Sequence, residues 1–277
     1  MSIVKALENI IFVANDSKPM SIPLANRLLG VSKSKIKNSK LVLISELKDS
    51  DFDNCDACCV LGGDGTILSC VTSVVNRNIP IFGVNLGKLG FLATFQDSIT
   101  DEIFLDLIGG NYRISERFLI AAKFKDKEIV ALNDVIIKQQ KTCDMLLSRV
   151  YADGEFLADY SSDGLILSSP TGSTAYNLSA GGPLLRPKSK ALILTPICPH
   201  TLSNRSIIFD DSSVLEIEAL TDGNIIVVDG KDYATMQKGE RIKITMSDKT
   251  LGFVRNKDHS YFKLLRNKLG WARNPSA

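Results

Sequence analysis

The first third of the chain alternates between short apolar runs and longer segments in which apolar residues recur at helical spacing. The apolar runs suit buried strands and cover residues 10–14, 41–44, 57–61 and 80–84. The helical segments run from the loop at 15–19 to about Gly30, from Ile67 to Val75 and from Thr100 to Ile108. Strands that alternate with helices predict a Rossmann-like α/β domain, a parallel sheet with helices on its faces. We place it at residues 1–112.

Past Tyr112 the pattern changes to short β-type runs separated by turn residues. These runs cover residues 118–124, 130–138, 145–151, 165–168, 191–195, 206–209, 214–220, 225–228 and 241–246. The dipeptide Asp153-Gly154 is a hairpin signal, because both residue types tolerate the backbone of a tight turn. The density of such runs predicts a β-rich domain at residues 113–258.

The end of the chain, residues 259–277, is predicted to be a helical tail that packs back on the protein. Phe262, Leu265 and Leu269 form its expected apolar stripe. The basic residues between them, Lys263, Arg266 and Lys268, suit a solvated face, and the alternative is a partner site.

Composition narrows the class of protein. The 277 residues are 44% hydrophobic, enough for one large or two medium domains. The formal net charge of +2 implies no polyanion partner such as nucleic acid. No uninterrupted apolar run approaches the roughly 20 residues that span a bilayer, and Glu8 and Asn9 interrupt the pattern of a signal peptide. We therefore expect a cytoplasmic protein without a membrane partner.

Cysteine and histidine give little support for a metal held by the protein. Cys58 and Cys59 fall on opposite faces of a predicted strand, which suits reduced packing residues. Cys55 and Cys58 form half of a zinc or redox motif, but no second pair follows, and the histidines are His200 and His259.

The stretch from Cys58 to Thr66 is the first candidate for chemistry. An apolar strand runs straight into Gly62-Gly63-Asp64-Gly65, and a helix is predicted to follow. Glycines let the backbone approach a ligand closely, and a helix start directs N–H groups at phosphate. Asp64 is unusual in such a turn, because a carboxylate repels phosphate unless it takes a proton or meets a metal. The turn is neither a Walker loop nor a dinucleotide fingerprint, and a plain strand-to-helix link is the alternative.

A second candidate is the hydroxyl-rich segment from Ser161 to Pro183. A strand is expected to end at Pro170, and a helix start is expected between Gly172 and Ser179. Ser, Thr and Tyr at this density suit hydrogen bonds to a polar, ring-bearing ligand. Helix capping and a solvated turn explain the same residues equally well.

Taken together, these motifs resemble the NAD kinase family, in the family's order and over nearly the whole chain. The motifs are Gly62-Gly63-Asp64-Gly65, Asn85-x-Gly-x-Leu-Gly-Phe91, Asn133-Asp134, Ser169-Pro170-Thr171-Gly172-Ser173-Thr174-Ala175-Tyr176, His200-Thr201-Leu202-Ser203-x-Arg205 and Lys268-Leu269-Gly270-Trp271. The resemblance implies transfer of a phosphoryl group from ATP, or from polyphosphate in some members, to the adenosine ribose 2′-hydroxyl of NAD, giving NADP. It also implies NAD bound between an α/β and a β-rich domain, and assembly into homodimers or homotetramers.

The resemblance assigns roles residue by residue. Asp64 matches the general base, with Gly65 against the substrate, and Gly62, Gly63, Gly65 and Thr66 form the phosphate-donor loop. Asn133 and Asp134 match a dipeptide that binds NAD, and Phe91 falls in a loop that closes over the same site. Further positions match dinucleotide contacts: Asp163, Thr171, Thr174, Ala175, Tyr176 and Ser179. Mg²⁺ would arrive with the phosphates of ATP.

Three departures from the family pattern are visible. Ser161 stands where many members carry Arg or His, so the charge contact is missing or comes from Lys138, Lys141 or Arg149. Ser69 stands where many relatives carry a basic residue, and Lys231 replaces the Gln of some relatives.

Two other functions share part of this pattern. A diacylglycerol- or sphingosine-type lipid kinase would share the Asp64 turn but would have a Gly-Thr-Gly-Asn type loop where this chain has Asn85-Leu86-Gly87. A sensor that binds NAD(H) without turnover would fit the missing basic residue at Ser161, although Asp64 is retained. We expect His200 to be structural, since it follows Pro199 at a strand end without an evident carboxylate partner.

Overall fold

The computed structural model describes residues 6–87, 90–141, 144–201, 203–257 and 260–271. The chain forms two compact units, Met1–Ser115 with Gly252–Ala277, and Glu116–Leu251. The chain passes from one unit to the other within two strands, β6 (Arg113–Phe124) and β17 (Arg241–Arg255). The C-terminal segment therefore returns to the first unit, as predicted for the tail.

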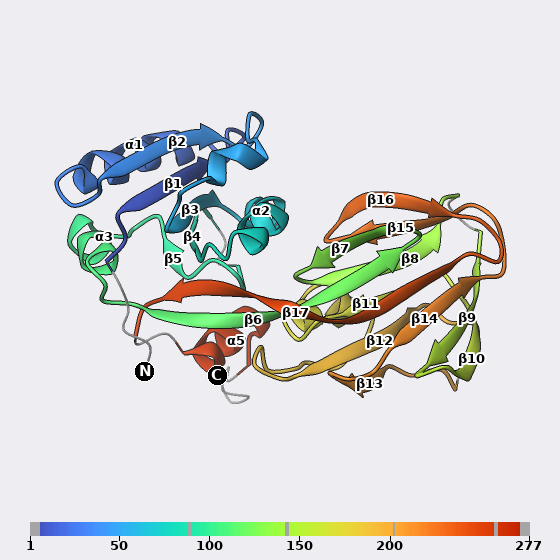
Figure 1. The fold of residues 1–277 in the computed structure, drawn as a ribbon. Helices are drawn as coiled ribbons and strands as arrows, with labels where there is room; N and C mark the ends of the chain where they lie inside the picture. The colour runs from blue at the N-terminus through green and yellow to red at the C-terminus, as the bar shows by residue number, and fades with distance from the viewer. Residues whose placement is uncertain (1–5, 88–89, 142–143, 202, 258–259, 272–277) are drawn as a thin grey trace. The chain divides into compact units, whose positions relative to one another are not determined.

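The first unit is built on a parallel sheet with the order β4-β3-β1-β2 (Figure 1). Its strands are β1 (Asn9–Ala14), β2 (Asn38–Leu43), β3 (Ala57–Gly62) and β4 (Ile81–Asn85). A short strand, β5 (Phe95–Gln96), and Phe253 of β17 also pair with β4 in parallel. The parallel sheet predicted from the alternating pattern is confirmed.

Helices cover both faces of this sheet. On one face, α1 (Ser21–Ser32) and α3 (Asp101–Ile108) share a core with Phe12 and Phe82, whose rings lie about 6 Å from that of Phe104. On the other face, α2 (Asp64–Asn76) packs Ile67 so closely on Gly83 that a Cβ there would lie 2.7 Å from it. A 3₁₀ turn, η1 (Asp49–Phe52), precedes β3. Cys58 and Cys59 are buried and free, as expected.

The C-terminal helix α5 (Tyr261–Leu269) begins at Ser260, whose hydroxyl accepts the Lys263 N–H, and ends at Gly270 with φ of +67°. The predicted apolar stripe is wrong for Phe262, which is 52% exposed, whereas Leu264 and Leu265 are buried. Residues 261, 264, 265 and 268 share one side of a helix at i, i+3, i+4 and i+7 spacing, and this register turns Phe262 outward.

The second unit consists of antiparallel strands, as expected for a β-rich domain. One sheet has the order β13-β12-β11-β8-β15-β16. Its strands are β8 (Asp134–Gln139), β11 (Gly164–Ser168), β12 (Ala191–Ile197), β13 (Ile207–Asp210), β15 (Asn224–Val228) and β16 (Lys231–Met236). Opposite it run β10-β9-β14-β17 and the pair β6–β7, with β7 (Lys127–Ala131), β9 (Leu146–Ala152), β10 (Glu155–Ser162) and β14 (Leu215–Ala219).

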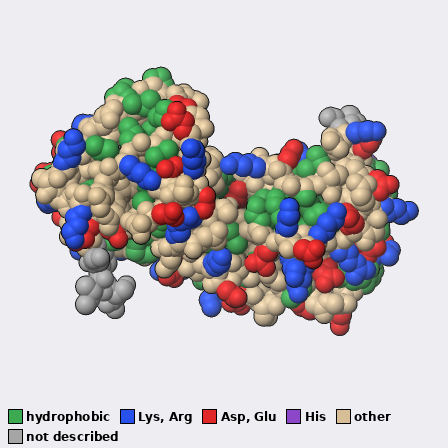
Figure 2. Space-filling view, turned by 45° about the horizontal axis from the view of Figure 1, so that its top comes forward, with side chains coloured by type: hydrophobic (Ala, Val, Ile, Leu, Met, Phe, Trp, Pro, Cys, Tyr) green, Lys and Arg blue, Asp and Glu red, His purple; other side chains and the backbone are tan. Residues whose placement is uncertain are grey.

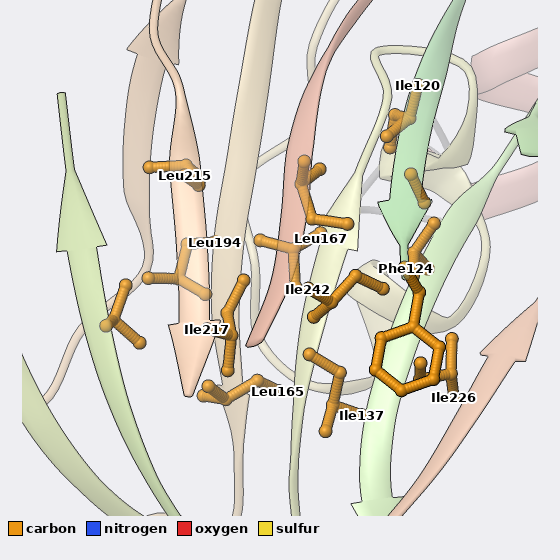
Figure 3. Close-up of a cluster of buried hydrophobic side chains, with 14 of the residues drawn as sticks. Ile120, Phe124, Ile137, Leu165, Leu167, Leu194, Leu215, Ile217, Ile226 and Ile242 are labelled. Carbon is orange, nitrogen blue, oxygen red and sulfur yellow. The ribbon is translucent and has the colours of Figure 1, made fainter. Parts of the chain in front are cut away.

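Inward-facing residues of these strands form the core of the second unit. Leu165 and Leu167 of β11 meet Leu215 and Ile217 of β14 and Ile242 of β17 (Figure 3). Alternate residues such as Ile136, Ile166 and Val227 face the other way, where they form a smaller cluster with Ala180. The segment after β11 therefore covers the outer face of its sheet, with η2 (Gly172–Thr174) and α4 (Tyr176–Ser179) in it.

One predicted strand is wrong in its continuity. The run at 130–138 is broken at Leu132-Asn133 into β7 and β8. The cause is tertiary: the carboxylate of Asp229 accepts the backbone N–H groups of Leu132, Asn133 and Asp134, at 2.8, 2.7 and 3.2 Å. The apolar pattern also does not reveal β16, half of whose residues are exposed.

The surface agrees with the near-neutral charge. Figure 2 shows basic and acidic side chains interspersed over the visible face. Within the described ranges, no helix is both long and apolar enough to cross a membrane.

Candidate functional site

The Gly62–Thr66 turn joins the carboxyl end of β3 to the first turn of α2. Gly62 allows no side chain, because a Cβ there would lie 2.3 Å from the hydroxyl of Thr66. That hydroxyl accepts a hydrogen bond from the Asn15 side chain at 2.8 Å, which ties the turn to the end of β1. Gly65 is exposed and Asp64 is half-buried at the first position of the helix. The turn is therefore fixed by the Asn15–Thr66 hydrogen bond and is exposed to solvent at Gly65.

The loop that carries Phe91 lies directly on the Asp64 carboxylate. Oδ2 accepts the N–H of Phe91 at 2.8 Å, and Oδ1 accepts those of Leu92 and Ala93 at 3.2 and 3.3 Å. Gly90 is required for this approach, since a Cβ there would lie 1.9 Å from Oδ1. The two motifs of the first unit therefore form one constellation, built on β3 and β4, whose ends pair at Gly62 and Asn85.

The C-terminal helix reaches the same loop. The Lys268 ammonium lies over the ring of Phe91, 5.7 Å from its centroid. Arg255, at the end of β17, donates a hydrogen bond to the hydroxyl of Thr94. Two positions of the loop, Phe91 and Thr94, are thus tied to residues from the last part of the chain.

In the second unit, Asn133 and Asp134 lie where β7 gives way to β8. Asp134 is buried, and burial, followed by the charge of Asp229, raises its pKa to about 7. Burial also raises the pKa of Asp229, but its three backbone N–H bonds and Lys231 act in the opposite direction. The backbone N–H bonds therefore make Asp229 the member of this pair that ionises more readily, whereas Asp134 keeps its proton up to about pH 7.

The Ser169–Gly172 turn packs against that dipeptide. Ser169 Oγ donates to the Leu132 carbonyl and accepts the N–H groups of Thr171 and Gly172, each at 3.1 Å. A Cβ on Gly172 would lie 2.0 Å from the Asn133 carbonyl oxygen. The hydroxyl of Thr171 is buried and has no hydrogen-bond partner among the residues described.

Several hydroxyls after this turn have structural partners. Ser173 Oγ donates to the Pro170 carbonyl at 2.7 Å, and Thr174 Oγ1 donates to the Thr171 carbonyl at 3.1 Å. Asn177 accepts a hydrogen bond from Thr195 at 2.7 Å. By contrast, Tyr176 is 45% exposed, Ser179 is exposed and Ala175 is half-buried. Turn formation therefore explains part of this motif and leaves Thr171 and Tyr176 unexplained.

Asp163 lies away from the dipeptide. It is exposed at the start of β11, where Gly164 pairs with Lys138, whereas Asp134 pairs with Ser168 at the other end. Four residues of strand separate the two ends by about 13 Å. Within one chain, the structure does not bring Asp163 together with Asn133.

The surroundings of Ser161 show which of the basic residues Lys138 and Arg149 is already paired with another side chain. Arg149 forms a bidentate ion pair with Asp159, in which Nε donates to Oδ1 at 2.7 Å and Nη2 donates to Oδ2 at 2.9 Å. Lys138 is exposed at the same end of β11. His200 is exposed, and its backbone N–H donates to the Ser161 carbonyl at 2.9 Å. His259, Leu202 and Leu89, which belong to the sequence motifs or to the histidine count, lie outside the described residues.

Two residues at this site are not predicted from the sequence. The sequence motifs include Ser169 only as one position of a longer run, and they do not include Asp229. The Asp229-Gly230 dipeptide is itself a hairpin signal, and this could have indicated the turn, though not what its carboxylate contacts. In the part of the chain that the structure describes, no group of three or more His, Cys, Asp or Glu residues could hold a metal ion.

Comparisons with known proteins agree along the chain. The model of the ATP-NAD kinase N-terminal domain matches residues 7–112, and that of the ATP-NAD kinase C-terminal domain matches residues 132–256. An NAD kinase of Caldicellulosiruptor saccharolyticus is 37% identical over 92% of this chain and 97% of the relative. An NAD kinase of Pseudomonas entomophila is 38% identical over 78% of this chain and 76% of the relative.

Solved structures show the same likeness. A yeast NADH kinase complexed with NADH matches with a TM-score of 0.86 and 25% identity, covering 98% of this chain and 89% of that one. An NAD kinase from Archaeoglobus fulgidus in complex with ATP matches with a TM-score of 0.79, covering 95% of this chain and 99% of that one. At 23% identity, the second match concerns the fold alone.

Proposed function

The chain belongs to the NAD kinase family and is a phosphotransferase that makes NADP from NAD, and we propose that Asp64 is the general base of this reaction. The 2′-hydroxyl oxygen of the adenosine ribose attacks the γ-phosphorus of ATP. A new O–P bond forms, the bond to the β–γ bridging oxygen breaks, and ADP leaves. The hydroxyl proton passes to the Asp64 carboxylate. A positioned base of this kind typically contributes ~10²–10⁴-fold to the rate.

One observation carries this assignment: the Asp64 carboxylate is held by the backbone N–H groups of Phe91, Leu92 and Ala93, and no basic side chain among the described residues pairs with it. Three backbone donors fix its position without adding a compensating charge. Phosphoryl transfer depends mainly on positioning and on electrostatic stabilisation. A carboxylate on a rigid turn, at the start of a helix that favours phosphate, meets both needs.

In the second unit, the proposed NAD contacts are Asn133, Asp134, Thr171 and Tyr176. A buried hydroxyl without a partner is costly unless a ligand satisfies it, which supports Thr171. The exposed ring of Tyr176 offers a face on which a base can stack. Thr174, Ala175, Ser179 and Asp163 stay predicted contacts, and Asp163 would meet a different part of the dinucleotide.

The phosphate donor is proposed to meet Gly62, Gly63, Gly65 and Thr66. Because the hydroxyl of Thr66 bonds Asn15, Thr66 would act by shaping the turn. Mg²⁺ is proposed to enter with ATP, since oxygen ligands from the phosphates suit it. A cytoplasmic location, a homodimer or homotetramer and the use of polyphosphate are likewise proposals.

The test uses the purified full chain with NAD, Mg²⁺ and either ATP or polyphosphate, coupled to an NADP-specific dehydrogenase. NADP is expected with ATP, and the Asp64→Asn variant is expected to form it at least ~10²-fold more slowly. Binding of NAD without NADP from either donor would replace the enzyme by a sensor. Phosphorylation of diacylglycerol or sphingosine in vesicles, without NAD binding, would replace it by a lipid kinase.

A further inference from the structure

Three consecutive backbone N–H groups converge on one side chain in the second unit. The Asp229 carboxylate accepts those of Leu132, Asn133 and Asp134 between 2.7 and 3.2 Å. In return, the Asp229 N–H donates to the Asp134 carbonyl at 3.0 Å. Hydrogen bonds to an ionised acceptor are about twice as strong as neutral ones. This set of bonds holds the chain in the break between β7 and β8.

The other side of the same segment is held as well. The Asn133 carbonyl accepts the N–H of Ser169 at 2.9 Å, and the Leu132 carbonyl accepts the hydroxyl of Ser169. Gly172 packs against the Asn133 carbonyl so closely that it leaves no room for a Cβ. The backbone of Asn133 is therefore fixed from two directions, by the hairpin turn at Asp229 and by the turn at Ser169.

The turn at Asp229 is built to direct its carboxylate. Asp229 and Gly230 have φ of 47° and 80°, the left-handed pair of a two-residue hairpin loop between β15 and β16. Aspartate tolerates this backbone better than most residues. Asparagine tolerates it too, so the turn alone does not require a charge.

We propose that Asp229 is a positioning residue for the substrate: its carboxylate holds Asn133 and Asp134 in the conformation that binds the ribose of NAD. This inference rests on the proposed function, in which the dipeptide contacts NAD. Asp229 acts on the substrate through the backbone of the dipeptide. Removing its charge therefore weakens NAD binding and leaves ATP binding unchanged.

The chain contains a matched control in the same unit. Asp153 and Gly154 have φ of 53° and 85° at the hairpin between β9 and β10. Asp153 Oδ1 accepts the Val214 N–H at 2.7 Å, and the Asp153 N–H donates to the Val214 carbonyl at 2.8 Å. The turn type and the kind of bond are the same, but the segment held at Val214, just before β14, carries none of the proposed NAD contacts.

The experiment compares Asp229→Asn with Asp153→Asn in the full chain, measuring the KM for NAD, the KM for ATP, and the Kd for NAD by calorimetry. Asp229→Asn is expected to raise the KM and Kd for NAD about 10-fold or more, the scale of a lost charged hydrogen bond. The KM for ATP should stay within about twofold, within ordinary mutational scatter. Asp153→Asn should leave all three constants unchanged.

An unchanged Kd for NAD in Asp229→Asn overturns the proposal, and so does an equal rise in Asp153→Asn. If Asp229→Asn does not fold, Asp229→Glu keeps the charge but displaces the carboxylate by one methylene, and the same selective loss of NAD affinity is expected. Failure of the proposed function is seen separately, because the wild-type chain would then form no NADP, whereas calorimetry with NAD still tests Asp229.

Discussion

The N–H of Phe91 donates a hydrogen bond to the carboxylate of Asp64 at 2.8 Å. This bond joins the turn after β3 to the loop after β4, so the proposed base and the loop expected to close over NAD are parts of one arrangement. A shift of the loop must therefore move the carboxylate, and the predictions for the first unit follow from that coupling.

Gly90→Ala tests the fit between loop and base. The new Cβ would lie 1.9 Å from Asp64 Oδ1, so either the carboxylate or the loop must move. A displacement of about 1 Å at a reacting group can cost ~10²-fold in rate, and we expect a loss of kcat on that scale. The control is Gly30→Ala in α1, where a Cβ meets nothing within 4 Å. Wild-type kcat in Gly90→Ala would show that the carboxylate need not be held there.

Lys268→Ala tests the link from the C-terminal helix to the loop. It removes the ammonium that lies 5.7 Å from the Phe91 ring centroid. Exposed cation–π contacts contribute about 0.5–1 kcal/mol, so the KM for NAD should rise about two- to fivefold. Lys263→Ala removes an exposed lysine from the same helix and should change nothing. An equal rise in both variants would point to a general charge effect.

Thr171→Val separates a ligand contact from a structural role. The variant removes a buried hydroxyl that has no partner among the described residues, at almost constant shape. Losing an unsatisfied hydroxyl should keep or raise the Tm, whereas the KM for NAD should rise about 10-fold if the ligand is that partner. Ser148→Ala is the matched control, since its buried hydroxyl also lacks a described partner. It should raise the Tm without changing the KM; an unchanged KM in Thr171→Val would remove Thr171 from the site.

The raised pKa of Asp134 predicts how the stability of the chain depends on pH. Its pKa is about 7 in the folded chain against an ordinary 3.8, so the folded state binds more protons between these values. The contribution of Asp134 to stability is then greatest below about pH 4 and falls as the pH rises to about 7. Asp134→Asn should thus gain Tm relative to wild type as the pH is raised from 4.5 to 8.

Asp159→Asn serves as the control for Asp134→Asn, because the pKa of Asp159 is shifted in the opposite direction. Hydrogen bonds from Arg149 hold the pKa of Asp159 below its ordinary value, so that its stabilisation is present at neutral pH and lost on acidification. Relative to wild type, this variant should lose Tm as the pH rises toward 3.8, the ordinary pKa, and the difference should then stay constant from pH 4.5 to 8. Parallel pH profiles for wild type and Asp134→Asn would contradict a protonated Asp134.

Local pattern was enough to predict the four main parallel strands of the first unit, though not the short strand β5. Residues 10–14 and 57–61 are buried on both faces, and parallel strands of this kind appear as continuous apolar runs. Because ligands lie beyond the carboxyl ends of parallel strands, the sequence alone also predicts that the turns at Gly62 and Asn85 share one edge of the sheet. The hydrogen bond from Phe91 to Asp64 joins residues 27 positions apart. It depends on the path of the loop after β4, which the pattern of apolar and polar residues does not predict.

Tertiary contacts account for what the sequence did not predict. The run at 130–138 has the pattern of one strand, but a carboxylate 97 residues from Leu132 divides it. The polar strand β16 owes its place to pairing with β15. The roles of Ser169 and Asp229 likewise lie in backbone bonds to distant segments, and a side chain's identity alone does not reveal them.

The most direct test of the central claim is the pair kcat and Kd for NAD in Asp64→Asn, measured against wild type with ATP and Mg²⁺. The amide keeps the size of the side chain but cannot take the hydroxyl proton, so kcat should fall by ~10²–10⁴-fold or more while calorimetry gives a Kd for NAD close to wild type. A kcat within about tenfold of wild type, below the range of a general base, would show that Asp64 is not the base.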